Sequence, residues 1–147
     1  MPAMQTYTHR QRAGRWLAIP AAVAIALALT SLFSSLKAIA WGIPFLVFMM
    51  WLFGSLTVTV AHGELRWRFG PGWIRFRVPL AEIRNARAIR TTWADGWGIH
   101  GTQFGTLYNV AGFAAVAMEL RGGRRLAVGT DEPDQLLGAL RSAGVAL

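Results

Sequence analysis

The chain of 147 residues contains no cysteine, and only 15% of its residues are charged. Without cysteine it can form neither a disulfide nor a thiolate metal or redox site. Acidic residues are also few, because 7 Asp and Glu stand against 15 Lys and Arg, which gives a formal net charge of +8 at pH 7. The composition therefore excludes cysteine-dependent chemistry and points to an anionic partner for the basic surface.

Charge is scarcest in residues 16–56, where Lys37 is the one charged residue. About 20 consecutive apolar residues suffice to cross a bilayer, so this run is long enough for two crossings. We predict a transmembrane helical hairpin there, with helices at about 16–33 and 38–56.

Basic residues flank this run on both sides, in the arm 1–15 before it and at Arg66 and Arg68 after it. Since the cytoplasmic flanks of membrane spans are enriched in Lys and Arg, we expect a multi-pass membrane protein with both termini in the cytoplasm. A cleaved secretory signal peptide is the alternative, because the arginine-rich start and the Ala-Ile-Ala at 38–40 imitate its regions. Its apolar core would exceed the roughly 7 to 15 residues that such peptides use, which favours the hairpin.

The pattern changes to alternating apolar and polar residues after the apolar run, which indicates a small, mainly β domain over residues 57–147. A C-terminal helix over residues 130–141 should close this domain, because Pro133 suits a first helical turn and Gly144 a helix end. The glycine-rich, aromatic segment 93–107 is either an extended loop or an irregular strand. Besides the hairpin described next, short strands are expected at residues 56–60, 83–91, 108–110, 113–120 and 124–129.

The segment ELRWRFGPGWIRFRVP, Glu64–Pro79, has the alternation of a β hairpin with one buried and one wet face. If Pro71-Gly72 forms a two-residue type II turn, the register follows residue by residue. The expected pairs are Leu65 with Val78, Arg66 with Arg77, Trp67 with Phe76, Arg68 with Arg75, and Phe69 with Ile74. Like charges directly opposite in a ladder are destabilising, so the arginines at positions 66, 68, 75 and 77 are our candidate lipid- or partner-binding residues.

Six or seven short strands followed by one amphipathic helix, together with three local motifs, carry a family resemblance. The motifs are Gly96-Trp-Gly-Ile99, Leu107-Tyr-Asn-Val110 and Val128-Gly-Thr-Asp-Glu-Pro133. Residues 55–143 resemble the bacterial pleckstrin-homology-like domains found in small membrane proteins. The resemblance implies a partly open barrel plugged at one end by the helix, often assembled into oligomers, and it implies no catalysis. With the predicted hairpin it also implies a location in the bacterial inner membrane.

The residues themselves also give no support for an enzyme. His9, His62 and His100 lack companions at metal-ligand spacing, and no Ser or Cys nucleophile stands in a fitting context. We therefore expect no catalytic residue, no cofactor and no metal. A nucleic-acid partner is also disfavoured, because the aromatic residues of the hairpin alternate onto the face opposite the arginines and so form no stacking platform.

Three interpretations of the four hairpin arginines stay open. They are a solvated face with local pairs to Glu64, Glu82 or Glu119, a surface for anionic phospholipid headgroups, and a surface for an acidic protein partner. The expected function is a membrane-anchored, pleckstrin-homology-like binding or scaffolding module on the cytoplasmic face. The alternative is a subunit of a homo- or hetero-oligomeric membrane assembly that acts through protein–protein contacts, for which a free strand edge is a template.

Overall fold

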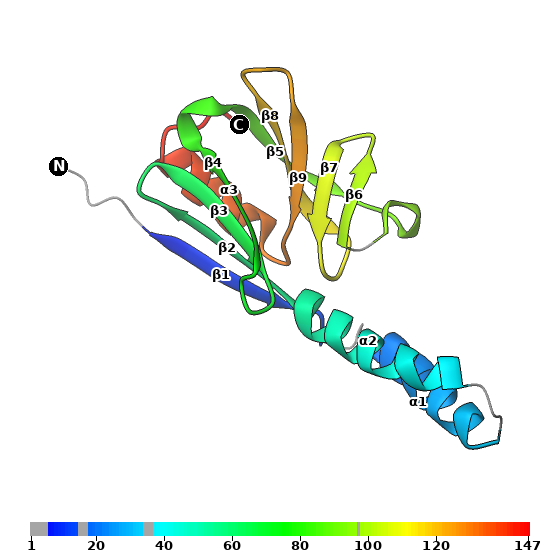
Figure 1. Ribbon diagram of the computed structural model, residues 1–147. Helices are drawn as coiled ribbons and strands as arrows, with labels where there is room; N and C mark the ends of the chain where they lie inside the picture. The colour runs from blue at the N-terminus through cyan, green and yellow to red at the C-terminus, as the bar shows by residue number, and fades with distance from the viewer. Residues whose placement is uncertain (1–5, 15–17, 34–36, 97) are drawn as a thin grey trace.

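The computed structural model describes residues 6–14, 18–33, 37–96 and 98–147. These residues form two β sheets, a helical hairpin that extends away from the sheets, and a C-terminal helix (Figure 1). The elements in chain order are β1 (Tyr7–Arg12), α1 (Ala18–Phe33), α2 (Lys37–Phe53), β2 (Ser55–Ala61), β3 (Glu64–Phe69), β4 (Ile74–Pro79), the short 3-10 helix η2 (Leu80–Glu82), β5 (Ile83–Arg90), the 3-10 helix η3 (Trp93–Asp95), β6 (Gly98–Thr102), β7 (Gly105–Asn109), β8 (Ala114–Leu120), β9 (Arg125–Gly129) and α3 (Pro133–Ser142).

The first sheet has the strand order β1-β2-β3-β4 and is antiparallel throughout. The second sheet has the order β5-β8-β9-β7-β6, and within it β7 and β9 run parallel. No pairing joins the two sheets in the described part of the chain. The expected partly open barrel is therefore wrong, because η2 turns the chain after β4 into a second sheet, whereas the mainly β content with one C-terminal helix is confirmed.

The core lies between the two sheets and is completed by α3. Large apolar side chains alternate inward along β3, where Leu65, Trp67 and Phe69 are at most 2% exposed. Leu136 and Leu140 of α3 are fully buried and belong to the same apolar cluster as inward residues of both sheets. The helix thus completes the apolar core that lies between the two sheets.

The predicted C-terminal helix is confirmed. Pro133 begins it, where a missing N–H costs no helical hydrogen bond. At its end Gly144 adopts a φ of 90°, and the N–H of Val145 donates to the carbonyl of Leu140 at 3.0 Å. This is the helix-ending motif in which a left-handed glycine lets the chain reverse and satisfies the last carbonyls.

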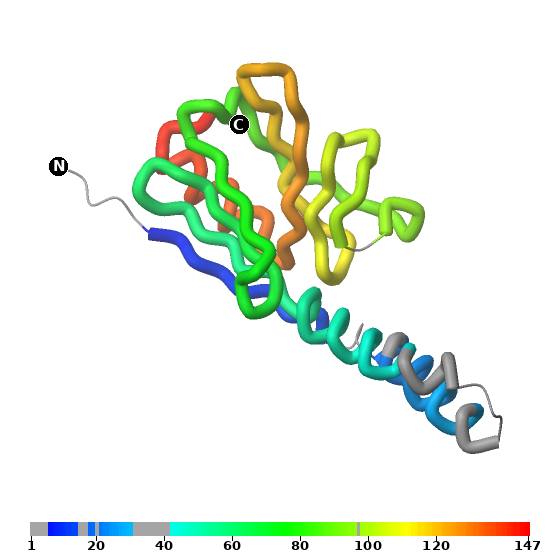
Figure 2. Tube along the Cα trace, viewed as in Figure 1, coloured from blue at the N-terminus to red at the C-terminus, as the bar shows by residue number. Residues whose placement is uncertain are grey.

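Strand β1 was not expected from the sequence. It pairs with β2 along its whole length, so the hairpin of α1 and α2 is inserted between two adjacent antiparallel strands (Figure 2). The N–H of Ala13 donates to the carbonyl of Gly54 at 2.9 Å and closes the ladder beside the helices. The strand escaped detection because its inward residues include His9 and Gln11, which give no apolar alternation.

The described helix α1 (Ala18–Phe33) lies within the predicted range of about 16–33. The helix α2 (Lys37–Phe53) begins one residue before the predicted range of about 38–56 and ends three residues before its end. The two helices have 16 and 17 residues, or about 24 and 26 Å at 1.5 Å per residue, against a hydrocarbon core of about 30 Å. Among the described residues, no helix combines the length and the apolar character needed to cross a membrane. The two-span transmembrane hairpin, the integral membrane partner, the multi-pass inner-membrane location and the orientation derived from them are therefore wrong.

The predicted second helix extended too far for a local reason at the end of the apolar run. Ser55 and Leu56 continue the run in sequence, yet they belong to β2 and pair with Arg12 and Gln11 of β1. Both residues are buried in the sheet. An apolar run can therefore combine helix and core strand, and the sequence alone does not show where one becomes the other.

Candidate functional site

The predicted register of the β3–β4 hairpin is confirmed. Arg66 lies opposite Arg77 and Arg68 opposite Arg75, on the outer face of the first sheet. The pairing ends at Phe69 and Ile74, so the connection has four residues, and the expected two-residue turn is wrong.

The end of α2 explains the longer connection. The N–H of Gly72 donates to the carbonyl of Phe69 at 2.8 Å, and Gly70 adopts a φ of 45°. A Cβ on Gly70 would overlap the backbone carbonyl oxygens of Trp51 and Leu52 at the end of α2. The turn thus packs directly against the base of the helical hairpin.

Strand β1 adds two arginines that sequence reasoning placed in an arm. Arg10 lies opposite Thr57, Thr57 opposite Arg68, and Arg68 opposite Arg75, so one row crosses all four strands. Arg12 lies opposite Ser55 on the same face. We call this surface the arginine face, and it consists of Arg10, Arg12, Arg66, Arg68, Arg75 and Arg77.

Among the residues that the structure describes, one acidic residue, Glu64, lies on the arginine face, at one end of it. The Glu64 carboxylate accepts from Nε and Nη2 of Arg66, both at 2.7 Å, and lies 3.8 Å from Nη1 of Arg77. No described residue forms an ion pair with Arg68 or Arg75. The interpretation as a face with local pairs therefore holds at the Glu64 end only, and the positive charge is concentrated around Arg10, Arg68 and Arg75.

A groove of about 530 Å³ runs over this face between the arginine side chains. Thr57 and Thr59 line it, and Arg10 donates to the Ser55 hydroxyl at 3.2–3.3 Å. Guanidinium groups carry donors in a planar fork that matches the oxygens of a carboxylate or phosphate. The groove thus has the chemistry to bind an anion. In the described part of the chain, no group of three His, Cys, Asp or Glu side chains could hold a metal ion.

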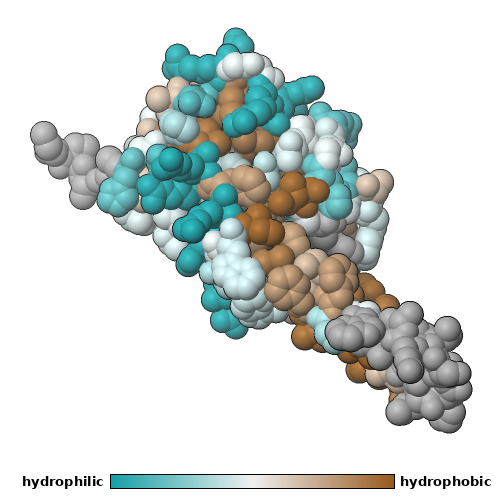
Figure 3. Space-filling model, viewed as in Figure 1, coloured by the Kyte–Doolittle hydropathy of each residue, from teal (hydrophilic) through white to brown (hydrophobic). Residues whose placement is uncertain are grey.

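An exposed aromatic cluster adjoins the unpaired end of the arginine face. Trp51 of α2 meets Trp73 edge to face, with ring centroids 5.2 Å apart, and Phe48 lies within 6.2 Å of both. All three are at least 40% exposed. Figure 3 shows hydrophilic side chains over the first sheet and apolar ones at the base of the helical hairpin. The sequence prediction had assigned Phe48 and Trp51 to a membrane span and had paired Trp73 with Gly70 beside the turn, so it did not bring these aromatic residues together.

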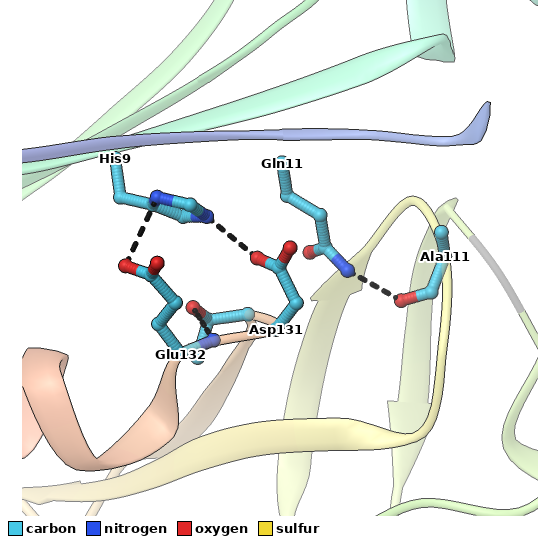
Figure 4. A network of polar contacts seen from close by, with 6 residues as sticks. His9, Gln11, Ala111, Asp131 and Glu132 are labelled. Atoms are coloured by element: carbon cyan, nitrogen blue, oxygen red, sulfur yellow. Dashed lines mark hydrogen bonds and ion pairs between the residues drawn. The ribbon is translucent and has the colours of Figure 1, made fainter.

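A second polar network ties β1 to the start of α3 (Figure 4). The two ring nitrogens of His9 lie 2.5 Å from the Asp131 carboxylate and 3.1 Å from the Glu132 carboxylate. The Gln11 side chain donates to the carbonyl of Ala111 at 2.9 Å. These contacts hold the inner face of β1 against the second half of the chain, so their role is to position the strand that carries Arg10 and Arg12.

Tyr7 lies on the same face of β1 as His9 and Gln11. Its raised pKa leads us to predict a loss of stability at alkaline pH. Burial raises its pKa from 10.0 to about 12, with further contributions from the nearby Glu132 and Asp131 carboxylates. Between these values the unfolded chain has lost the proton that the folded protein keeps, so the free energy of unfolding should fall as pH rises from about 10 to about 12. Tyr7→Phe should make this fall shallower. Urea unfolding of both proteins from about pH 8 to 12 checks this, and equal slopes would contradict it.

No protein-family model matches the chain, and no curated protein matches it either. The resemblance to pleckstrin-homology-like domains is tested by neither comparison and stays a prediction.

Proposed function

We propose that the protein is a binding module without catalytic activity, whose arginine face holds an anionic group of a partner. The observation that supports this most is the row of Arg10, Arg68 and Arg75, which crosses the sheet with no carboxylate among the described residues to neutralise it. A phosphate or a carboxylate is the chemistry that fits such a row. The exposed aromatic cluster favours the alternative, a subunit of an assembly, which also stays a prediction.

The energetics of the sheet support a ligand at this place. Two arginine pairs lie directly opposite each other, and each such pair costs a few tenths of a kcal/mol or more. Glu64 offsets the cost for Arg66 and Arg77. The pair Arg68 and Arg75 has no such compensation within the described residues. An anion between these two guanidinium groups would turn a repulsive contact into two charge-assisted hydrogen bonds.

The alternative interpretation is that the arginine face is only solvated and binds no ligand. The chain offers a matched control for the loss of charge. Arg121 and Arg124 are exposed residues at the β8–β9 connection, which belongs to the second sheet. Changing both to threonine removes the same net charge as changing Arg68 and Arg75. A general attraction to a protein of net charge +8 would weaken equally in both double variants.

Arg68→Thr combined with Arg75→Thr should weaken anion binding without weakening the fold. We expect roughly 30-fold weaker binding, at about 1 kcal/mol for each lost charge at an anionic surface. The free energy of unfolding should stay unchanged or rise slightly, because the repulsion is relieved and threonine suits a strand. Binding is measured with two separate probes, vesicles that contain an anionic phospholipid and a free polyglutamate peptide. Urea unfolding measures the free energy of unfolding. Equal losses in the control double variant Arg121→Thr with Arg124→Thr would return the arginines to a solvated face.

A further inference from the structure

Strand β4 is a free edge of the first sheet. It pairs with β3 and with no other strand of the described chain. The N–H of Leu80, just after β4, donates to the carbonyl of Gly63, just before β3. The N–H of Gly70, just after β3, donates to the carbonyl of Ser55 in β2, on the other side of β3. Because antiparallel ladders alternate, the backbone groups of Ile74, Phe76 and Val78 then point toward β3.

The backbone N–H and C=O groups of Arg75 and Arg77 consequently point outward from the sheet. No described residue hydrogen-bonds to these four groups. Pro79 has no N–H and ends the edge on one side, as proline does where a strand must not be extended further. The open edge therefore has the length of a short strand, centred on Phe76.

The two faces of this edge differ in chemistry. Arg75 and Arg77 are exposed on the outer face. Phe76 points inward and is only half-buried, with its ring centroid 4.7 Å from that of Tyr108 and 5.7 Å from that of Trp67. An added strand would meet positive charge on one face and aromatic surface on the other.

We propose that β4 is completed by an extended segment of a protein partner in which acidic and apolar residues alternate. This inference rests on the proposed function and deepens it by naming the partner. Directly opposite residues of a ladder share a face, so acidic residues would stand opposite Arg75 and Arg77, and an apolar residue opposite Phe76. Main-chain hydrogen bonds provide affinity in such strand addition, and the alternate side chains provide specificity.

The outward backbone groups favour a peptide over a phosphate headgroup. Arg75 and Arg77 each offer a donor and an acceptor, and only another strand supplies both at matching spacing. A phosphate supplies acceptors for the guanidinium groups but leaves the two carbonyls and the aromatic surface at Phe76 unused. The edge as a whole is therefore complementary to an acidic–apolar–acidic segment.

Two synthetic peptides of one composition test the strand directly. The first alternates, Ser-Glu-Val-Glu-Val-Glu-Ser, and the second groups the acids, Ser-Val-Val-Glu-Glu-Glu-Ser. The full chain should bind the alternating peptide about tenfold more tightly. When two carboxylates stand opposite Arg75 and Arg77, the alternating peptide places a valine opposite Phe76, whereas the second peptide places a glutamate there. Hydrogen exchange followed by NMR should show new protection at the amides of Arg75 and Arg77.

A pair of variants separates the backbone contribution from the charge. Arg77→Thr and Arg77→Pro both remove the guanidinium, but only proline removes the outward N–H, and it breaks no bond to β3. Binding of the alternating peptide should be about fivefold weaker in Arg77→Pro than in Arg77→Thr, which corresponds to one net hydrogen bond. Should the proline variant unfold, the wild-type protein is measured with peptides N-methylated either at the amides that face β4 or at the others. Only the first set should lose affinity.

The outcomes separate this inference from the proposed function. The wild type could bind the two peptides equally, and the double variant Arg68→Thr with Arg75→Thr could lose this binding. That result would overturn strand addition but would still support anion binding at the arginine face. Binding to anionic vesicles with no preference for the alternating peptide would do the same. No arginine-dependent binding to any of these probes would overturn both.

Discussion

Replacing Gly105 by alanine should lower the free energy of unfolding by about 3 kcal/mol, from strained backbone together with overpacking. Gly105 begins β7 with a φ of 95°, a conformation that side chains rarely adopt. A Cβ there would overlap the backbone carbonyl of Arg125 and come within 2.8 Å of its Cβ. The strand β9 that begins at Arg125 pairs in parallel with β7, so the clash falls on the junction that holds the second sheet together.

Gly101 provides the matched control for this change. It lies in β6 of the same hairpin, and a Cβ at Gly101 would meet nothing within 4 Å. Gly101→Ala should therefore change stability by less than about 1 kcal/mol. Urea unfolding followed by circular dichroism compares the two variants. Similar stability of both would show that β7 and β9 do not approach each other as described.

The second large effect is expected from Phe69→Ala. Phe69 is 0% exposed, and its ring centroid lies 5.3 Å from that of Phe53 at the end of α2. Truncating a buried phenylalanine costs about 3 to 5 kcal/mol, since contacts are lost and a cavity remains. The change should also loosen the helical hairpin from the sheet, because Phe69 joins β3 to α2.

Phe45→Ala is the control for the second prediction. Phe45 also belongs to the helical hairpin, in α2, but is 64% exposed. Its truncation should cost less than about 0.5 kcal/mol, as is usual for surface positions. The midpoints of urea unfolding measure both effects. A loss at Phe45 as large as that at Phe69 would mean that the hairpin is buried in a way the structure does not describe.

The β3–β4 hairpin shows what a sequence can specify. Its apolar residues are large and alternate strictly, and a one-residue slip would move every one of them to the wrong face, so the register was predictable. The turn was not, because its length depends on contact between Gly70 and the end of α2. The parallel pairing of β7 with β9 is also invisible locally, since it joins segments that have no shared turn.

The arginine face was predicted in part for a related reason. The four hairpin arginines follow from local alternation. Arg10 and Arg12 reach the face only because β1 pairs with β2, from which the helical hairpin separates it in the sequence. The inward residues of β1 are satisfied by distant partners, as His9 is by Asp131, 122 positions along the chain. Polar pairs of this kind leave no periodic signal, so a strand held by them is mistaken for a basic arm.

The central claim is that anions bind at the arginine face and not through net charge alone. Its most direct test is the affinity of the full chain for the polyglutamate peptide over a series of salt concentrations, in the wild type and in two double variants of equal charge. Arg68→Thr with Arg75→Thr should bind more weakly and with a shallower dependence on salt than Arg121→Thr with Arg124→Thr, since fewer screened contacts remain. Identical affinities and identical salt dependence in the two double variants would contradict the claim.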